Sequence, residues 1–359
     1  MAKKFRKIGV LTSGGDAPGM NAAIRAIARS AIDDGLEVVG IKGGYSGLIR
    51  NELIDLSARS VSNIVYTGGS FLFTDRCPEF KTPEGIAKAI DTCKKNEIDA
   101  IVAIGGDGTF RGATDLTNHG IPTIGVTGTI DNDITATDYA VGFDTAMNTA
   151  LNAIDCIHDT IESHARCMVV EVMGRNCGQI ALNVGIAAGA TAVVIPEIKF
   201  DLEACIEKIL KMKENGKRSH IIVVAEGVFN PDGTHFSESL VKIIEERTGI
   251  ETKFDRLGYI VRGGKPTLRD RLAASRMGDM AVKLLLAGES NKVICEINSQ
   301  IVPVDINYAL VLDRMYKNTL KDGDLDRFTP EEIGSMKATC AIRSANIKKL
   351  YDLSLEMAK

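Results

Sequence analysis

The chain contains no run of about 18 apolar residues, which is the length that a membrane-spanning helix needs. Its first residues, Met1 to Arg6, also lack the apolar core of a secretory signal. The eight cysteines form no C-x-x-C pair, so we expect free thiols in a reducing compartment. Together these absences predict a cytoplasmic protein that has no membrane partner.

A strong charge of one sign is missing as well. The 43 Lys and Arg residues nearly balance the 47 Asp and Glu residues, and the formal net charge is −4. Such a total attracts the chain neither to nucleic acid nor to acidic membranes. A polyanionic substrate must therefore be held by local groups of arginine side chains.

A metal-ligating cluster has little support in the sequence. His158, Glu162 and His164 stand close together, but residues 149–162 have helical periodicity and no second ligand-dense stretch accompanies them. We therefore favour the surface of a helix here and keep a metal site as the alternative.

Short apolar, β-forming segments alternate along the chain with segments of helical periodicity. The predicted strands cover residues 7–11, 37–41, 100–104, 122–126, 168–172, 192–196, 221–225 and 293–297. Such alternation predicts the α/β fold class, with mostly parallel sheets covered by helices on both faces. A length of 359 residues suggests two domains of this kind.

Three glycine-rich turns each follow a predicted strand directly: Thr12–Asn21, Gly105–Thr109 and Gly128–Asp133. A strand, a glycine turn and a helix N-terminus together make a seat for an anion. A strand that ends in Gly-Gly-Asp adds a carboxylate to free N–H groups, which suits a phosphate chain and Mg²⁺. One such turn is an ordinary connection, but three in order predict a phosphoryl-transfer site.

At these residues the chain resembles the phosphofructokinase family, closely its bacterial type. The matching stretches are residues 11–25, 68–80, 105–109, 128–133, 171–175 and 262–271. The Gly105–Thr109 stretch also occurs in lipid and NAD kinases, whereas Thr129–Asp133 and Met173–Arg175 are far more specific. The resemblance implies transfer of the γ-phosphoryl group of ATP to the 1-hydroxyl of fructose 6-phosphate, in glycolysis. The alternative is pyrophosphate as the phosphoryl donor.

The resemblance also implies the catalytic residues. Asp131 is the general base, because an ionised carboxylate can accept the proton of the attacking hydroxyl. The alternative role for Asp131 is a cap of a helix or a turn. Arg175 lies in one of the two specific stretches. The implied catalytic set is Gly15, Thr129, Asp131, Asp133 and Arg175.

For ATP, the resemblance implies that Asp107 approaches the phosphates through Mg²⁺, directly or through water. The alternative for Asp107 is a side chain that stabilises its own turn. Arg76 would neutralise charge in the transition state, although an isolated arginine is usually solvated. The implied ATP-binding set is Gly15, Arg76, Cys77, Gly106, Asp107, Gly108 and Thr109.

For the sugar phosphate, guanidinium groups suit the phosphate dianion and a carboxylate can accept from sugar hydroxyls. In the family, arginines matching Arg166 and Arg262 reach the site from a neighbouring subunit. This implies a homotetramer with shared active sites, with a dimer as the alternative. The implied substrate-binding set is Thr129, Ile130, Asp131, Arg166, Met173, Gly174, Arg175, Glu226, Arg262 and Arg271.

Two glycines bear on the choice of donor. Pyrophosphate-using members typically carry Asp where this chain has Gly108, and Lys where it has Gly128. A carboxylate at position 108 would crowd or repel the α-phosphate, whereas glycine leaves space for a nucleotide. Both positions therefore predict ATP. The family usually carries Pro where this chain has Thr127, and His where it has Tyr259. These departures spare the charged groups, so they bear on the fine geometry of the substrate more than on activity.

An effector site is a weaker expectation. Allosteric bacterial members bind an anion between subunits, and Arg25, Arg29, Lys217 and Arg218 match basic positions of that site. However, His158 stands where an arginine is common, and Thr191 where a metal-binding glutamate is common. We expect weak control by ADP or phosphoenolpyruvate.

The resemblance implies two similar doubly wound, Rossmann-like, three-layer αβα domains. Residues 1–141 and 269–319 would form the ATP-binding domain, and residues 142–268 the fructose 6-phosphate-binding domain. A C-terminal extension covers residues 320–359, in which we expect a helix to open at Pro330–Glu332 and residues 347–357 to be helical. The extension and residues 229–256 both exceed the shorter bacterial pattern, and we expect them to be surface elaborations rather than catalytic parts.

Overall fold

The computed structural model describes residues 5–358. The chain folds into two compact units. Unit 1 comprises Met1–Ile130, Ile134–Thr145 and Arg262–Cys340, and unit 2 comprises Asp131–Asp133, Ala146–Val261 and Ala341–Lys359. The short segment Asp131–Asp133 is thus grouped with unit 2, although the chain on both sides of it belongs to unit 1.

Unit 1 is built on a seven-stranded sheet with the order β11-β10-β5-β4-β1-β2-β3. Its strands are β1 Lys7–Thr12, β2 Glu37–Ile41, β3 Leu53–Leu56, β4 Ala100–Gly105, β5 Thr123–Thr127, β10 Lys292–Ile297 and β11 Gln300–Asp305. The five strands in the middle of this order run parallel to one another. The edge strands β3 and β11 pair antiparallel with their neighbours.

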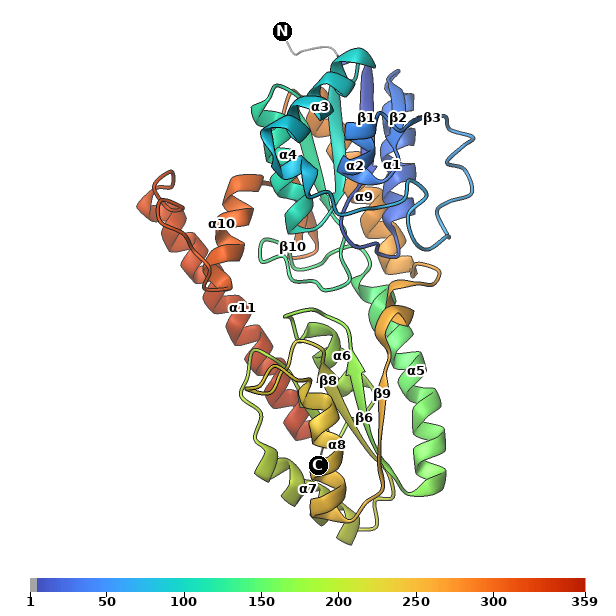
Figure 1. Cartoon of the computed structure of the whole chain (residues 1–359), viewed down its shortest axis with the longest axis vertical. Helices are drawn as coiled ribbons and strands as arrows, with labels where there is room; N and C mark the ends of the chain where they lie inside the picture. Colours follow the sequence, from blue (N-terminus) through green and yellow to red (C-terminus); the bar gives the residue numbers. More distant parts are fainter. Residues whose placement is uncertain (1–4, 359) are drawn as a thin grey trace. The chain divides into compact units, whose positions relative to one another are not determined.

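Helices cover both faces of this sheet (Figure 1). They are α1 Met20–Asp33, α2 Gly44–Arg50, α3 Pro83–Lys95, α4 Asp107–Asn118, α9 Leu268–Leu286, α10 Ile306–Tyr316 and the 3-10 helix η1 Glu79–Lys81. One core cluster joins α2, α3 and α4 to the sheet through residues such as Leu48, Ile90, Leu116 and Ile101. Helices α1 and α9 pack closely, because a Cβ at Gly278 would lie only 3.0 Å from the carbonyl oxygen of Ala23.

Unit 2 is built on a four-stranded parallel sheet with the order β7-β8-β6-β9. Its strands are β6 Cys167–Val172, β7 Ala192–Val194, β8 His220–Ala225 and β9 Thr252–Arg256. Its helices are α6 Gln179–Ala187, α7 Leu202–Glu214, α8 Phe236–Thr248 and the 3-10 helix η2 Gly258–Arg262, together with most of α5 Phe143–His164. Helices α7 and α8 cover one face through Ile206, Ile209 and Leu240.

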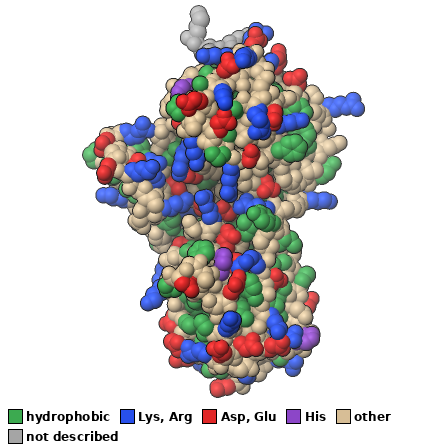
Figure 2. Space-filling view, in the orientation of Figure 1, with side chains coloured by type: hydrophobic (Ala, Val, Ile, Leu, Met, Phe, Trp, Pro, Cys, Tyr) green, Lys and Arg blue, Asp and Glu red, His purple; other side chains and the backbone are tan. Residues whose placement is uncertain are grey.

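The fold class predicted from the sequence is confirmed, and each predicted strand is present. Three strands at sheet edges, β3, β9 and β11, were not predicted. All eight cysteines are free thiols, as expected. The residues 5–358 form no helix that is long and apolar enough to cross a membrane. Figure 2 shows both basic and acidic side chains on the visible surface.

The C-terminal extension contains one long helix, α11 Pro330–Met357. Its start is fixed by a capping box: Thr329 N donates to Glu332 Oε2 at 2.8 Å, and Glu332 N donates to Thr329 Oγ1 at 3.2 Å. The helix therefore begins at Pro330, as predicted. Its residues up to Cys340 are grouped with unit 1, and those from Ala341 with unit 2.

The candidate metal ligands of the 149–162 region lie on α5. His164 Nδ1 lies 2.9 Å from the backbone oxygen of Thr160, and Ser219 donates to Glu162. Within the described part of the chain, no group of three or more His, Cys, Asp or Glu residues is placed to hold a metal ion. The helical interpretation of this segment is confirmed.

A buried carboxylate anchors the start of α9 in unit 1. Asp270 accepts hydrogen bonds from Tyr139 Oη at 2.5 Å, from Gly142 N at 2.6 Å and from Thr145 N at 2.9 Å. We expect Asp270→Ala to lower the free energy of unfolding by about 3 kcal/mol, because these buried donors lose their acceptor. Urea denaturation measures this change. Asp279→Ala, at a partly exposed position of the same helix, is the control, and an equal loss in both variants would contradict the prediction.

Candidate active site

The three glycine turns meet at one edge of the unit 1 sheet. Strand β4 lies between β1 and β5, and all three run parallel. Thr12 is in register with Ile104, and Gly105 is in register with Thr127. The turns therefore leave the sheet side by side at its carboxyl edge, where open α/β sheets bind their ligands.

Hydrogen bonds join these turns. Ser13 N donates to Ile104 O at 3.0 Å, and Gly128 N donates to Gly105 O at 2.9 Å. The buried hydroxyl of Thr109 donates to Ser13 O at 3.0 Å, so this predicted ATP-binding residue holds two turns together. A Cβ at Gly105 would lie 2.3 Å from Thr109 Oγ1 and 2.5 Å from Ser13 O, which explains the glycine.

In contrast, the space around the second turn is open. A Cβ at Gly106 or at Gly108 would meet no atom of the described residues within 4 Å. Helix α4 begins at Asp107, so its first N–H groups and the positive end of its dipole face this space. Asp107 forms an ion pair with Arg111, and its side chain is 25% exposed. The turn can therefore accept an anion that approaches from solvent.

Two arginines of the predicted site, Arg76 and Arg262, lie beside the first glycine turn. Gly14 N donates to Asp75 O at 3.1 Å and Thr74 Oγ1 donates to Gly14 O at 2.9 Å, which places the exposed Arg76 beside this turn. Arg262 Nη1 donates to Asp16 O at 3.1 Å. A Cβ at position 15 would lie only 2.8 Å from that nitrogen, so Arg262 contacts the turn of its own chain.

Two other predicted site residues of unit 1, Cys77 and Arg271, contribute to packing or to local structure. Cys77 is partly buried and packs against the core cluster under α2 and α3. Arg271 lies in the first turn of α9, where its Nε donates to Pro266 O at 2.7 Å. Their predicted contacts with ATP and with the sugar phosphate stay predictions.

In unit 2, a second set of predicted residues meets at the carboxyl edge of the sheet. Strands β6 and β8 are neighbours, with Val172 in register with Ala225, so Met173–Arg175 and Glu226 follow them at one edge. Glu226 Oε1 accepts hydrogen bonds from Gly174 N at 3.2 Å and from Arg175 N at 2.7 Å. Arg175 has a left-handed backbone, with φ 57°, and an exposed side chain.

The segment Asp131–Asp133 belongs to unit 2. Asp131 is only 7% exposed, and Asn132 beside it has a left-handed backbone with φ 49°. Asn132 Nδ2 donates to Gln179 Oε1 at 2.8 Å, and Arg343 Nη2 donates to Asn132 O at 2.6 Å. Gln179 and Arg343 were both missed in the sequence analysis, since neither lies in a glycine-rich turn or in a stretch that matches the family.

Arg166 is separated from the other predicted substrate-binding residues of unit 2. It stands before β6, whereas Met173–Arg175 follow it, and the six residues of β6 span about 20 Å. Arg166 Nε donates to Glu251 Oε2 at 2.8 Å, and this contact, together with a hydrogen bond from Lys253, lowers the pKa of Glu251 to about 2. Within one chain, Arg166 therefore does not join Arg175 and Glu226.

The residues predicted for an effector site are divided between the units. Arg25 and Arg29 lie on α1 in unit 1, whereas Lys217 and Arg218 are exposed in the connection from α7 to β8 in unit 2. Burial, followed by the charge of Arg29, lowers the pKa of Arg25. The buried Thr191 hydroxyl lies 3.4 Å from His220 Nδ1.

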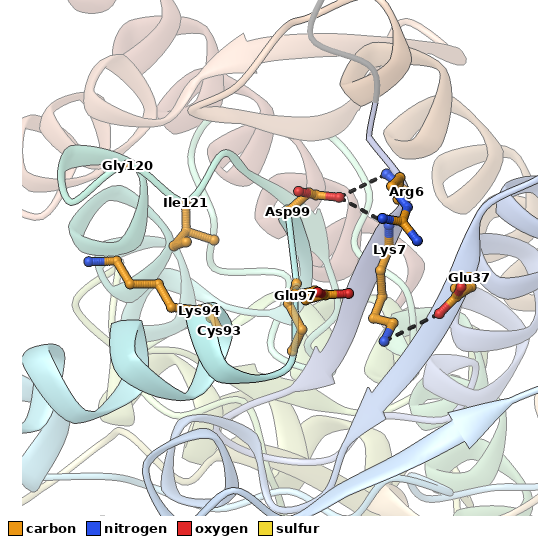
Figure 3. A pocket seen from close by; sticks show the side chains of 10 residues that line it. Arg6, Lys7, Glu37, Cys93, Lys94, Glu97, Asp99, Gly120 and Ile121 are labelled. Carbon is orange, nitrogen blue, oxygen red and sulfur yellow. Dashed lines mark hydrogen bonds and ion pairs between the residues drawn. The ribbon is translucent and has the colours of Figure 1, made fainter.

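A cavity of about 470 Å³ opens at the amino edge of the unit 1 sheet (Figure 3). Asp99 Oδ2 accepts from Arg6 N at 2.8 Å and from Lys7 N at 3.1 Å, and Lys7 pairs with Glu37 at 3.2 Å. Asp99, Lys7 and Glu37 are thus already engaged in contacts within this lining. No predicted site residue lines this cavity.

Comparisons with known proteins agree with this geometry. A family model described as phosphofructokinase matches residues 7–285. The ATP-dependent 6-phosphofructokinase of Clostridium tetani is 49% identical over 316 residues, which make up 88% of this chain and 97% of that protein.

Solved structures are similar to this chain as well. A phosphofructokinase of Saccharomyces cerevisiae has a TM-score of 0.82 and 32% identity, covering 89% of this chain and 47% of the yeast chain. This chain thus spans about half the length of the yeast chain. The pyrophosphate-dependent phosphofructokinase of Nitrosospira multiformis has a TM-score of 0.75 and 22% identity, over 85% of this chain and 84% of its own, and shares the fold.

Proposed function

This chain belongs to the phosphofructokinase family, and we propose that it is an ATP-dependent 6-phosphofructokinase. It transfers the γ-phosphoryl group of ATP to the 1-hydroxyl of fructose 6-phosphate, and the products are fructose 1,6-bisphosphate and ADP. The observation that carries the proposal is the meeting of three glycine turns at one sheet edge, the third of which continues into the buried Asp131.

On the ATP side, the N-terminus of α4 binds the phosphates through its free N–H groups and its dipole. Asp107 stands at this N-terminus with a partly exposed carboxylate, which is the type of oxygen ligand that Mg²⁺ prefers. One protein carboxylate is sufficient to bind Mg²⁺ here, because the ion usually completes its coordination shell with phosphate oxygens and water. When bound, the ion neutralises charge on the phosphates. Arg76 lies beside the neighbouring turn and adds a second cation.

On the sugar side, Asp131 accepts the proton of the attacking hydroxyl, which makes the oxygen a better nucleophile. Glu226 uses one carboxylate oxygen to fix the backbone of Gly174 and Arg175, so it shapes the turn that presents the Arg175 guanidinium. That guanidinium is exposed and suits a phosphate group.

A coupled assay that detects fructose 1,6-bisphosphate tests this proposal. With fructose 6-phosphate and Mg²⁺, ATP should support turnover with a kcat/KM that exceeds the value for pyrophosphate by orders of magnitude. A protein that leaves fructose 6-phosphate unchanged with either donor would contradict the proposed activity. Comparable turnover with pyrophosphate would contradict the proposed donor.

The place of Arg166 at the other end of β6 supports the proposal that this residue serves the site of another subunit. An Arg166→Ser chain and an Asp131→Asn chain should each be poorly active alone. In randomly mixed oligomers, about a quarter of the sites should contain both intact residues, so activity should partly return. The measurement is the specific activity of co-refolded mixtures whose mixing is verified by mass spectrometry.

The control for this experiment pairs Asp131→Asn with Arg175→Ser, because both of these residues belong to unit 2 of one chain. That mixture should show no recovery. If the Arg166→Ser mixture also fails to recover in verified mixed oligomers, the proposal of sites shared between subunits is wrong. The homotetramer, the cytoplasmic location and weak effector control stay predictions from the sequence.

A further inference from the structure

Helix α11 lies beyond the family match, which ends at residue 285. The part of α11 that belongs to unit 2 is firmly packed, since Ile347 is 5% exposed and Tyr351 is 7% exposed. Arg343 is half-buried and lies one helical turn before Ile347, so both side chains project from the same packed face. Its guanidinium is therefore directed into unit 2 rather than toward solvent.

Arg343 contacts the segment that carries the proposed base. Its Nη2 donates to the backbone oxygen of Asn132 at 2.6 Å, and Asn132 follows Asp131 directly in the chain. The same oxygen lies 3.4 Å from Gln179 Nε2, and the Asn132 side chain donates to Gln179 Oε1 at 2.8 Å. Side chains from α11 and α6 thus hold the Asn132–Asp133 peptide, one residue beyond Asp131.

A carboxyl group lies near the guanidinium. Burial raises the pKa of the nearby Glu197, and the positive charge of Arg343 is among the influences that oppose this rise. Glu197 is itself fixed, because its Oε1 accepts from Gly178 N at 2.8 Å at the start of α6. Asn132, Gln179 and Arg343 therefore form one hydrogen-bonded network inside unit 2, and Glu197 lies near it.

We propose that Arg343 is a positioning residue for phosphoryl transfer, which α11 supplies from outside the family match. It does not touch the reacting atoms. It holds the carbonyl of Asn132, and so keeps the carboxylate of Asp131 at hydrogen-bond distance from the sugar hydroxyl. A base displaced by about 1 Å can lose up to about 100-fold in rate, so one such restraint can matter for turnover. This inference rests on the proposed function.

The test is the variant Arg343→Met, in which an unbranched aliphatic side chain remains but the N–H donors of the guanidinium are removed. We expect kcat to fall by about tenfold, while KM for ATP and for fructose 6-phosphate changes by less than about twofold. Arg343→Lys should recover part of the lost kcat, since it restores one charged donor. The matched control is Lys349→Met, which removes an exposed cation from the same helix and should leave kcat unchanged.

Two further readouts separate positioning from general support of the fold. Thermal unfolding and active-site titration give kcat per folded site, which a merely structural role would not change. The pair Arg343→Met and Gln179→Leu should be non-additive in kcat, because both side chains hold the same peptide.

The inference is overturned if kcat per folded site in Arg343→Met stays within about twofold of the wild type. It is also overturned if Lys349→Met loses as much activity. A wild-type protein without phosphofructokinase activity would instead contradict the proposed function, so the two failures are distinguishable.

Discussion

Replacing Asp131 with asparagine should lower kcat by about 100-fold or more and leave KM for both substrates almost unchanged. Asparagine keeps the size of the side chain and most of its hydrogen bonding, but it cannot accept the proton of the sugar hydroxyl. Because Asp131 is only 7% exposed, bulk water is a poor substitute for the missing carboxylate. Steady-state kinetics with ATP and fructose 6-phosphate measure the effect.

The matched control is Asp91→Asn, which removes an exposed carboxylate that pairs with Lys95 on α3. That variant should retain the wild-type kcat. If Asp131→Asn retains near-normal turnover in a correctly folded protein, Asp131 is not the base. An increase in KM with kcat unchanged would instead give Asp131 a role in binding the sugar only.

Much of the fold was predictable because the parallel strands are buried on both faces. A strand such as Ala100–Gly105 is an apolar run that ends in glycine, and it is easily recognised in the sequence. The edge strands give a weaker signal. Strand β9 contains Phe254 as its single apolar residue, and β11 contains Pro303, a residue that sheets tolerate mainly at an edge.

The candidate site also contains parts that the sequence predicts and parts that it does not. The glycine turns were predicted because their chemistry is local: each requires particular residues within a few positions of a strand end. Contacts between distant residues leave no such pattern. Arg343 reaches Asn132 across 211 positions, and Arg262 reaches Asp16 across 246 positions. No periodicity or spacing in the sequence brings these pairs together, so only the folded chain reveals them.

The structure distinguishes the two glycines that were predicted to select the donor. A Cβ at Gly128 would lie 3.2 Å from Ile104 Cγ2 and 3.5 Å from Met20 Cε, so a larger residue there needs its neighbours to shift. A Cβ at Gly108 meets nothing within 4 Å among the described residues. A substitution at position 128 therefore changes both the packing of its neighbours and the contacts with the donor. A substitution at position 108 changes only the contacts with the donor, so its effect on ATP use can be assigned to the charge.

Gly108→Asp should lower kcat/KM for ATP by at least about 100-fold, because a carboxylate and a phosphate about 4 Å apart repel by about 4 kcal/mol near a protein surface. The fold should tolerate the change, since an acidic residue in the first turn of α4 interacts favourably with the helix dipole. The kinetic constants for ATP, at saturating fructose 6-phosphate, measure the effect.

Two controls separate the charge from other causes of a loss in ATP use. Gly108→Ala adds a methyl group in open space and should keep kcat/KM for ATP within about threefold of the wild type. Gly334→Asp places the same charge at an open, exposed position of α11 and should have no effect. If kcat/KM for ATP is the same in Gly108→Asp as in Gly108→Ala, the phosphates of ATP do not bind beside this turn. Selection against pyrophosphate would then depend on residues elsewhere in the chain.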